Sequence, residues 1–436
     1  MTNFKWTNAS VLAFAGESDP IRAMEERARA LALKAMDDGW GGPPYDPLAL
    51  AEWRHIRVTA RDDIADARTV SAQDGSLVLE FNPLRPRGRL RFSIAHEIAH
   101  SLFEDCAEEA RYRGGHEAFA RDNWQLEVLC NIGAAELLMP LGSFSELAGE
   151  TLSIKTILDL RKRFDVSVES CLIRLVKLAR QPSAAFCSSL HEDGNYYIDY
   201  VIPASGWDCP IHIGQAVPGT SVVREADAIG FTATGEEVWE PGQTVRVECV
   251  GLAPYPGSIV PRVVGLFLKS DEQAYQAPTI AEVDGDALHP RGNGRRIIAH
   301  VIPDSSTAWG GRGFAAQVRS RFPDVWRKFR VEADGYGRTS RLGEVFTGRL
   351  TNDIQIAHMV AQRGIGPSTH GPRLSYAALA RCLATVCKEA QTQGASIHMP
   401  RIGTGHGGAN WALVRELVSQ ELVAKGISTT VYTLPM

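Results

Sequence analysis

From residue 296 to the end of the chain, short apolar runs alternate with longer stretches of helical periodicity. The expected strands are RIIAHVIP, DIQIAHMVAQ, SIHMPRIG and STTVYTLP, and the expected helices lie near 313–321, 375–394 and 410–426. Strands that alternate with helices indicate a sheet with helices on its faces. The sequence therefore predicts an α/β domain at residues 294–436.

The remainder of the chain is expected to hold further domains, because 436 residues are too many for one hydrophobic core. Residues 184–275 contain short β-like runs separated by Pro and Gly, namely YYIDYVIP, IHIGQAV, QTVRVECVGL and RVVGLFLK. They predict a β-rich middle domain. Residues 276–293 are polar, contain Pro and Gly and show no period, which indicates a linker.

The first 183 residues carry mainly helical signals. Helices are expected at 19–39, from about Ser93, from 123 to near Pro140, and as two short pieces within 153–179. Asp165 or Ser167 could cap the second short helix. Strands are expected at IRVTARDDI and GSLVLEFNP. This pattern predicts an α+β domain at 1–150 and a helical subdomain at 151–183.

Composition narrows the class of protein. A net charge of −5 leaves no overall electrostatic footprint for nucleic acid or an anionic membrane, although local basic patches stay possible. The eight cysteines form no C-x-x-C pair, which argues against a disulfide framework and a Cys-rich zinc site. We find no signal peptide and no apolar run long enough to span a membrane, so we expect a cytoplasmic protein.

The stretch RFSIAHEIAHSLFED, residues 91–105, contains the order H-E-x-x-H. On a helix, His96 and His100 project from one face and can share a Zn²⁺ ion, while Glu97 can act as general base on a metal-bound water. A catalytic zinc also needs a third protein ligand and an open position. The alternative is a helix with two solvated histidines. The apolar flanks disfavour it, because a buried His–Glu–His set without partners is costly.

RLRFSIAHEIAHSLFED and the downstream QLEVLCNIGAAELLMP resemble the ImmA/IrrE family of zinc metallopeptidases, over residues 20–180. The resemblance implies a zincin-like fold with Glu127 as the third zinc ligand and a structural role for Glu136. Asn131, one turn after Glu127, is a candidate partner for a metal-ligating side chain. The resemblance also implies a site-specific endopeptidase that cuts a transcriptional repressor of a mobile element or of a stress response.

Residues 153–179 match the helix-turn-helix-like subdomain of that family. The alternative, which we favour, is a pair of packing helices that never touch DNA. Five basic side chains permit DNA contact without requiring it: Arg161, Lys162, Arg163, Arg174 and Lys177.

Two Gly-rich loops follow expected strands of the C-terminal domain, in DSSTAWGGRGFAAQV and HMPRIGTGHGGANW. A loop between a strand and a helix presents backbone N–H groups and the positive end of the helix to an anion. Ligands bind open α/β sheets at the carboxyl ends of strands, so the pair predicts a nucleotide site rather than two ordinary turns. The candidate residues are Gly310, Gly311, Gly313, Phe314, Gly403, Thr404, Gly405, His406, Gly407 and Gly408.

RRIIAHVIP, GGRGFAAQV, MPRIGTGHGGANW and TVYTLP resemble a macro domain, the ADP-ribose-binding fold, of the branch with the terminal ADP-ribose protein glycohydrolase. The resemblance implies an α/β/α fold with ADP-ribose over both loops. The chain departs from that branch at its two catalytic positions. The Lys position falls near Gln362 or Arg363, and the Asp position falls at or beside Gly407. Without these groups the covalent route of that branch has no chemistry, whereas binding through backbone amides could survive, with Asp304 or His406 as candidates for residual hydrolysis.

Three functions follow from these features. The first is a zinc endopeptidase gated by an ADP-ribose-type ligand. The second is an ADP-ribosyl hydrolase, which the missing Lys and Asp disfavour. The third is a non-catalytic reader of ADP-ribosylated targets with a structural zinc, which an intact Glu97 disfavours because a structural site needs no base.

Overall fold

The computed structural model describes residues 6–434 except for 73, 107–122, 141–143, 145–151, 180, 205, 241–242, 255–258, 260, 270–278, 306–312, 335–340, 367–370 and 406. The chain divides into two compact units. The first comprises Met1–Glu25, Gly42–Met139 and Gly149–Ala277, and the second comprises Glu26–Gly41, Pro140–Ala148 and Pro278–Met436. Within the described part of the chain, no helix is both long enough and apolar enough to cross a bilayer.

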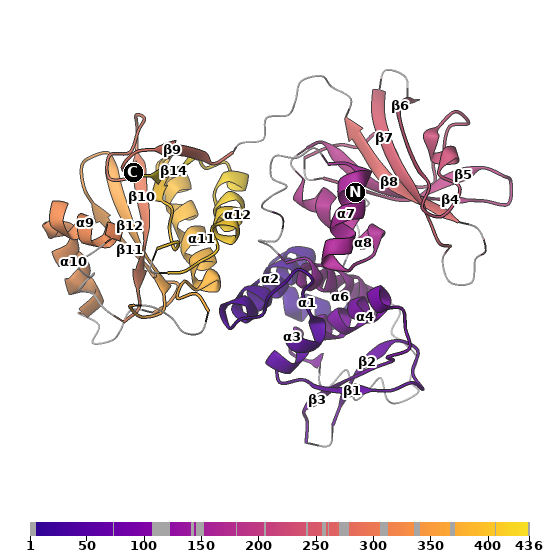
Figure 1. Cartoon of the computed structure of the whole chain (residues 1–436), viewed down its shortest axis with the longest axis horizontal. Coiled ribbons are helices and arrows are strands. Elements are labelled where there is room, and N and C mark those ends of the chain that lie inside the picture. Colours follow the sequence, from indigo (N-terminus) through magenta and orange to yellow (C-terminus); the bar gives the residue numbers. More distant parts are fainter. Residues whose placement is uncertain are drawn as a thin grey trace. The chain divides into compact units, whose positions relative to one another are not determined.

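The N-terminal part of the first unit combines a small sheet with helices (Figure 1). The three strands lie in the order β1-β3-β2, and their bounds are Arg57–Ala60 (β1), Ala67–Ser71 (β2) and Leu77–Phe81 (β3). The helices are α1 (Ala9–Ala15), α2 (Pro20–Asp37, of which the first residues belong to this unit), α3 (Pro47–Trp53), α4 (Arg87–His100) and α6 (Asn123–Leu138). The prediction at 19–39 is confirmed as α2, and the helix from 123 ends close to Pro140 as expected. Strand β2 was not predicted.

Helix α4 begins six residues before Ser93, so the predicted start was wrong. No side chain caps its first turn. Two ion pairs lie at this turn: Arg87 Nε is 2.5 Å from Asp165 Oδ2, and Arg89 Nη2 is 2.6 Å from Asp66 Oδ2. The helix begins at Arg87, well before its apolar stretch.

Helices α4 and α6 pack closely because α6 contains Gly133. A Cβ atom at Gly133 would lie 2.8 Å from both Ala99 Cβ and Met24 Sδ, closer than van der Waals contact allows. Ala99 and Met24 are themselves buried. Because Gly133 has no side chain, α6 packs directly against α4.

The helical pair of the first unit consists of α7 (Ile154–Phe164) and α8 (Val168–Leu178). Ser167 caps α8 by accepting the Ser170 N–H, while Asp165 ends α7 in the left-handed conformation. Of the two predicted caps, Ser167 is the correct one.

The rest of this unit is an antiparallel sheet in the order β5-β4-β8-β7-β6. Its strands are β4 (Ser183–Leu190), β5 (Tyr196–Pro203), β6 (Thr232–Glu240), β7 (Gln243–Leu252) and β8 (Arg262–Lys269), with a 3-10 turn at Val222–Glu225. Three predicted runs are strands, but IHIGQAV is not: Ile213 is exposed and Gly214 has a φ of 79°. The rings of Phe186 and Phe267 stack with their centroids 4.2 Å apart in the hydrophobic core beside this sheet.

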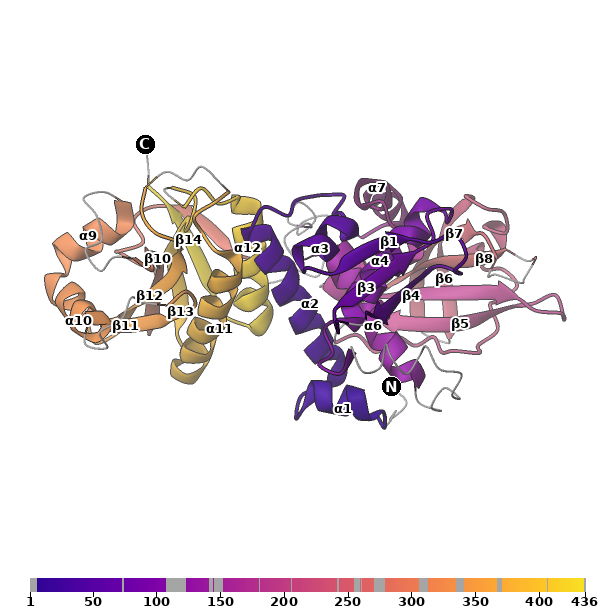
Figure 2. The same ribbon diagram turned by 90° about the horizontal axis from the view of Figure 1, so that it is seen from below.

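The second unit contains a six-stranded sheet in the order β11-β12-β10-β13-β14-β9. Its strands are β9 (Ala281–Asp284), β10 (Arg296–Pro303), β11 (Val345–Arg349), β12 (Ile354–Gln362), β13 (Ser396–Pro400) and β14 (Thr429–Thr433). Only β11 runs antiparallel to its neighbour. Helices α9 (Gly313–Arg321) and α10 (Pro323–Asp334) lie on one face, and α11 (Tyr376–Gln393) and α12 (Trp411–Glu421) lie on the other (Figures 1 and 2).

Three features of this unit differ from the sequence prediction. Residues 281–284, within the expected linker, form the edge strand β9 that pairs with β14, and Leu288 is buried. The linker prediction was wrong here because the strand is too short and polar to show a period. Helix α10 and strand β11 were not predicted.

Candidate metal centre and candidate nucleotide site

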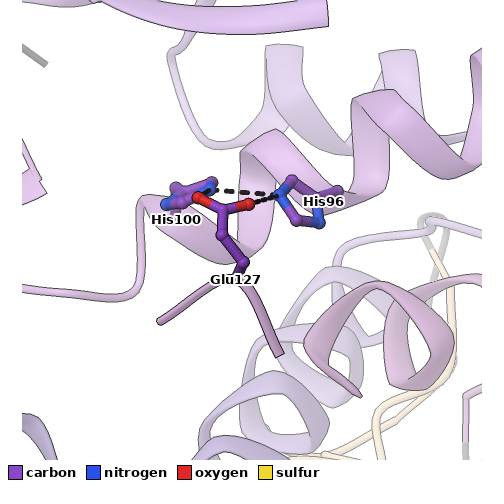
Figure 3. Close-up of side chains that lie close together, drawn as sticks. All are labelled: His96, His100 and Glu127. Atoms are coloured by element: carbon purple, nitrogen blue, oxygen red, sulfur yellow. Dashed lines mark hydrogen bonds and ion pairs between the residues drawn. The ribbon is translucent and has the colours of Figure 1, made fainter. Parts of the chain in front are cut away.

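Helices α4 and α6 bring three side chains together, and Figure 3 shows Glu127 directed at both histidines. His96 Nε2 lies 3.1 Å from His100 Nε2 and 3.1 Å from Glu127 Oε2. His100 Nε2 lies 3.6 Å from Glu127 Oε1. In the described part of the chain, these three residues are the group of His, Cys, Asp and Glu side chains that could hold a metal ion.

The spacing of these atoms matches a tetrahedral metal site. Ligands about 2.05 Å from a tetrahedral zinc are about 3.3 Å from each other. The three separations, 3.1, 3.1 and 3.6 Å, scatter around that value. Two imidazole nitrogens and a carboxylate also form a donor set that zinc prefers. The residues present therefore fit zinc, with a fourth position left for a water or substrate.

The charges at the centre are arranged to favour a cation. Burial favours the neutral form of His96, but the hydrogen bond with Glu127 and the charges of Glu97 and Glu127 outweigh it and raise the pKa of His96. Burial likewise opposes ionisation of Glu127, but its hydrogen bonds with His100 and His96 hold its pKa far below the ordinary range. The ionised carboxylate thus persists at neutral pH.

Two further side chains act on this centre. Asn131 Oδ1 lies 2.9 Å from His96 Nδ1, so the amide oxygen can accept the Nδ1–H and leave Nε2 with its lone pair toward the metal position. Glu97 is 7% exposed, and among the described residues its Oε2 has no hydrogen-bond partner. A buried carboxylate oxygen without a protein partner is suited to accept a proton from a water.

Glu136, expected to be structural, is buried and pairs with Arg174 of α8. Arg174 Nη2 donates to Glu136 Oε2 at 2.7 Å, and Arg174 Nε donates to the carbonyl of Met139. Arg174 is 4% exposed, so it is unavailable to DNA. Lys177 is 3.5 Å from Glu25.

Helix α8 is also packed against the antiparallel sheet. Its Glu169 accepts hydrogen bonds from Tyr200 of β5 and Arg262 of β8 at 2.7 Å each. A helix covered in this way resembles a packing element more than a DNA-recognition helix, which supports the reading that we favoured. Lys162 and Arg163, at the end of α7, are exposed.

The predicted nucleotide loops follow two strands at which the connections of the second sheet reverse direction. Strands β10 and β13 are parallel neighbours. The chain continues from β10 to β11 and β12 on one side, whereas it continues from β13 to β14 on the other. Such a switch point, here called the crevice, is where open α/β sheets bind ligands.

The loop after β13 is shaped by its glycines. Gly403 and Gly408 have φ values of 77° and 61°, which side chains rarely adopt. A Cβ at Gly407 would lie 2.5 Å from the carbonyl oxygen of Gly403, so only glycine allows this close backbone approach. A Cβ at Gly405 would meet nothing within 4 Å. The loop thus turns tightly on itself and leaves open space in front of Gly405.

The other predicted loop residues are placed in part. Gly313 has a φ of 80° at the start of α9, and Phe314 packs its ring 5.5 Å from that of buried His300. Thr404 donates to the carbonyl of Arg401. Gly310, Gly311 and His406 lie outside the described residues.

The position that lacks the glycohydrolase Lys is occupied by Gln362 or Arg363, at the end of β12, and both side chains make contacts within this unit. Gln362 donates to the carbonyl of Gly364, and Arg363 pairs with Asp38 at 3.2 Å. Asp304 accepts the N–H of Gly364 at 2.8 Å. All three side chains therefore make structural contacts within the second unit.

Two parts of the chain are similar to known proteins. Residues 55–176 match the IrrE N-terminal-like domain family, Peptidase_M78. The radiation response metalloprotease IrrE of Deinococcus deserti is 33% identical over 113 residues, which are 24% of this chain and 38% of that protein. The chromodomain-helicase-DNA-binding protein 1-like of Mus musculus is 32% identical over 179 residues, 38% of this chain and 19% of that protein.

The C-terminal part is similar to solved macrodomain structures. A macrodomain protein from Streptomyces coelicolor is 33% identical, covers 36% of this chain and 99% of its own, and gives a TM-score of 0.31. The chain spans less than two fifths of both curated relatives named above. It is a multidomain α/β protein that carries an IrrE-like metallopeptidase domain at residues 55–176 and has macrodomain proteins among the relatives of its C-terminal part.

Proposed function

We propose that the chain is a zinc-dependent, site-specific endopeptidase whose second unit binds ADP-ribose or a related nucleotide. The observation that carries the peptidase half is the convergence of His96, His100 and Glu127 within 4.8 Å, beside the buried carboxylate of Glu97. The three residues would hold the ion. When bound, zinc lowers the pKa of a water and polarises the scissile carbonyl.

Glu97 is proposed as the general base. Its buried carboxylate removes a proton from the attacking water and can return it to the leaving amine. Asn131 keeps His96 in the tautomer that presents Nε2 to the metal. Glu127 keeps its negative charge at neutral pH, which helps to retain the cation.

The substrate proposed is a DNA-binding transcriptional repressor, cleaved in the cytoplasm as part of a stress response. The IrrE of Deinococcus deserti is described as a radiation response metalloprotease, which supports this class of role. We propose no direct DNA contact by α8, because its basic residues Arg174 and Lys177 are paired with carboxylates.

The nucleotide half of the proposal is supported by the crevice between β10 and β13 and by the open space in front of Gly405. The backbone N–H groups of such a loop and the positive N-terminal end of the helix that follows it, α12, can bind the negative charge of a diphosphate. The missing Lys and Asp favour binding over hydrolysis. An ADP-ribosyl hydrolase remains the second candidate, favoured only by Asp304 at the rim of the crevice.

The test is incubation of the zinc-loaded protein with the repressor encoded beside its gene, with and without ADP-ribose. Mass spectrometry should show one cleaved bond and a rate that changes with ADP-ribose. Release of ADP-ribose from a modified protein, without cleavage of the repressor, would favour the hydrolase instead.

A further inference from the structure

The second unit contains a buried carboxylate from the N-terminal part of the sequence. Asp37, the last residue of α2, is 5% exposed. Its Oδ2 accepts a hydrogen bond from Ser375 Oγ at 2.5 Å, and its Oδ1 accepts the Tyr376 N–H at 2.6 Å. A carboxylate at the first N–H groups of a helix interacts favourably with the helix dipole. Asp37 therefore fixes the start of α11 although 338 residues separate it from Ser375.

The residues that Asp37 contacts also hold the loop after β13. Leu374 donates its N–H to the carbonyl of Gly407 at 3.1 Å. Tyr376 accepts the N–H of Asn410 on its hydroxyl at 3.0 Å. The Leu374 side chain lies against Gly403, where an added Cβ would be 2.7 Å from Leu374 Cδ2. A continuous set of contacts thus runs from Asp37 through residues 374–376 to both ends of the 403–410 segment.

Helix capping alone does not require Asp37. Ser375 already caps α11, because its hydroxyl accepts the Ala378 N–H at 3.1 Å. Burying a carboxylate is costly, and burial raises the pKa of Asp37 while its hydrogen bonds with Ser375 and Tyr376 oppose that rise. The neighbouring Asp38 pairs with Arg363, which follows directly on β12 at the rim of the crevice. Two successive carboxylates therefore meet the connection between β12 and α11.

We propose that Asp37 is a positioning residue for the nucleotide site: it immobilises residues 374–376, and these hold the 403–408 loop in the shape that accepts a diphosphate. The inference rests on the proposed function of that loop. It predicts that nucleotide affinity depends on a residue from the N-terminal part of the sequence, and that residues 294–436 alone form an incomplete site.

The first test measures binding of ADP-ribose to the full-length protein by calorimetry. Asp37→Ala should weaken binding about tenfold or more, since it removes two hydrogen bonds to a charged group. The control is Arg29→Ala. Arg29 also belongs to α2, and its Nη1 lies 3.6 Å from Glu421 Oε1 of α12. This variant should bind ADP-ribose within about twofold of the wild type, because Arg29 makes none of the hydrogen bonds that link Asp37 to residues 375 and 376.

The second test keeps the inference falsifiable if Asp37→Ala folds poorly or if ADP-ribose does not bind. Hydrogen exchange of the Tyr376 and Asn410 amides is compared between the wild type and Asp37→Asn, which preserves the size of the side chain. Faster exchange at both amides supports the positioning role. An unchanged Asn410 amide, or unchanged ADP-ribose affinity in Asp37→Ala, overturns it. A wild type that binds no ADP-ribose refutes the proposed nucleotide function, and the exchange data then decide the positioning role alone.

Discussion

At the proposed metal centre three side chains on two helices would carry the chemistry, whereas at the proposed nucleotide site of the second unit the backbone of a glycine loop would carry it. The proposed metal centre depends on donor atoms about 3 Å apart, so changing any one of these residues would remove a ligand. The crevice depends on loop shape, which neighbouring residues support from a distance. Substitutions should therefore act locally and severely at the first site, and in a graded, distributed way at the second.

The largest expected effect is loss of metal. His96→Ala and Glu127→Ala should each retain little of the roughly one zinc per chain expected for the wild type, because two protein ligands seldom hold zinc tightly. Metal analysis by plasma mass spectrometry checks this. His191→Ala, an exposed histidine of the same unit, is the matched control. Full zinc in Glu127→Ala would show that another residue is the third ligand.

A smaller effect is expected at the glycine loop. Gly405→Val should weaken ADP-ribose binding about 10- to 100-fold, because the side chain extends into the open space where the diphosphate would approach the backbone. The fold should be kept, since a Cβ at this position meets nothing within 4 Å. Gly219→Val, at an equally open glycine of the first unit, should not change binding in calorimetry. Equal affinities of the two variants would contradict a site at this loop.

The smallest effect is the change in stability with pH that two buried histidines of the second unit should cause. His300 and His358 lie on adjacent strands with His300 Nε2 2.6 Å from His358 Nδ1, and burial lowers the pKa of His300 to about 3 and that of His358 well below normal. Both are neutral when folded. The unfolded chain takes up protons below its pKa of about 6.5, so stability is lost as pH falls from there toward the folded pKa.

At pH 5 this loss amounts to about 2 kcal/mol for His300. Urea unfolding at pH 7 and pH 5, monitored by hydrogen exchange of the amides in β10 and β12, measures this loss of stability. His300→Phe should lessen the difference between the two pH values. The same difference in that variant would mean that other groups cause the acid sensitivity.

The same comparison explains how far the sequence could predict the structure. His96 and His100 could be selected from the H-E-x-x-H spacing, and Glu127 could be selected from the resemblance to the ImmA/IrrE family. The structure brings the three side chains together. The glycines at 403–408 could be selected because tight turns need them. Asp37 could not, because its partners Ser375 and Tyr376 are more than 330 residues away and no local pattern marks it.

Fold elements were missed for a related reason. Strands β2 and β9 are short and contain polar residues. They form strands because β2 pairs with β3 and β9 pairs with β14. The first turn of α4, from Arg87, is polar and makes ion pairs with Asp165 and Asp66, so the apolar periodicity does not mark it. Tertiary contacts, rather than local propensity, decide such segments.

The central claim is that Glu97, beside the three metal-binding side chains, is the base of a zinc endopeptidase. The most direct measurement compares repressor cleavage by the wild type and Glu97→Gln at equal zinc content, by mass spectrometry of the products. The account predicts that Glu97→Gln binds zinc and folds as the wild type does but cleaves about 10²- to 10⁴-fold more slowly, because the amide cannot accept the proton. Cleavage at the wild-type rate by the zinc-loaded variant would contradict it.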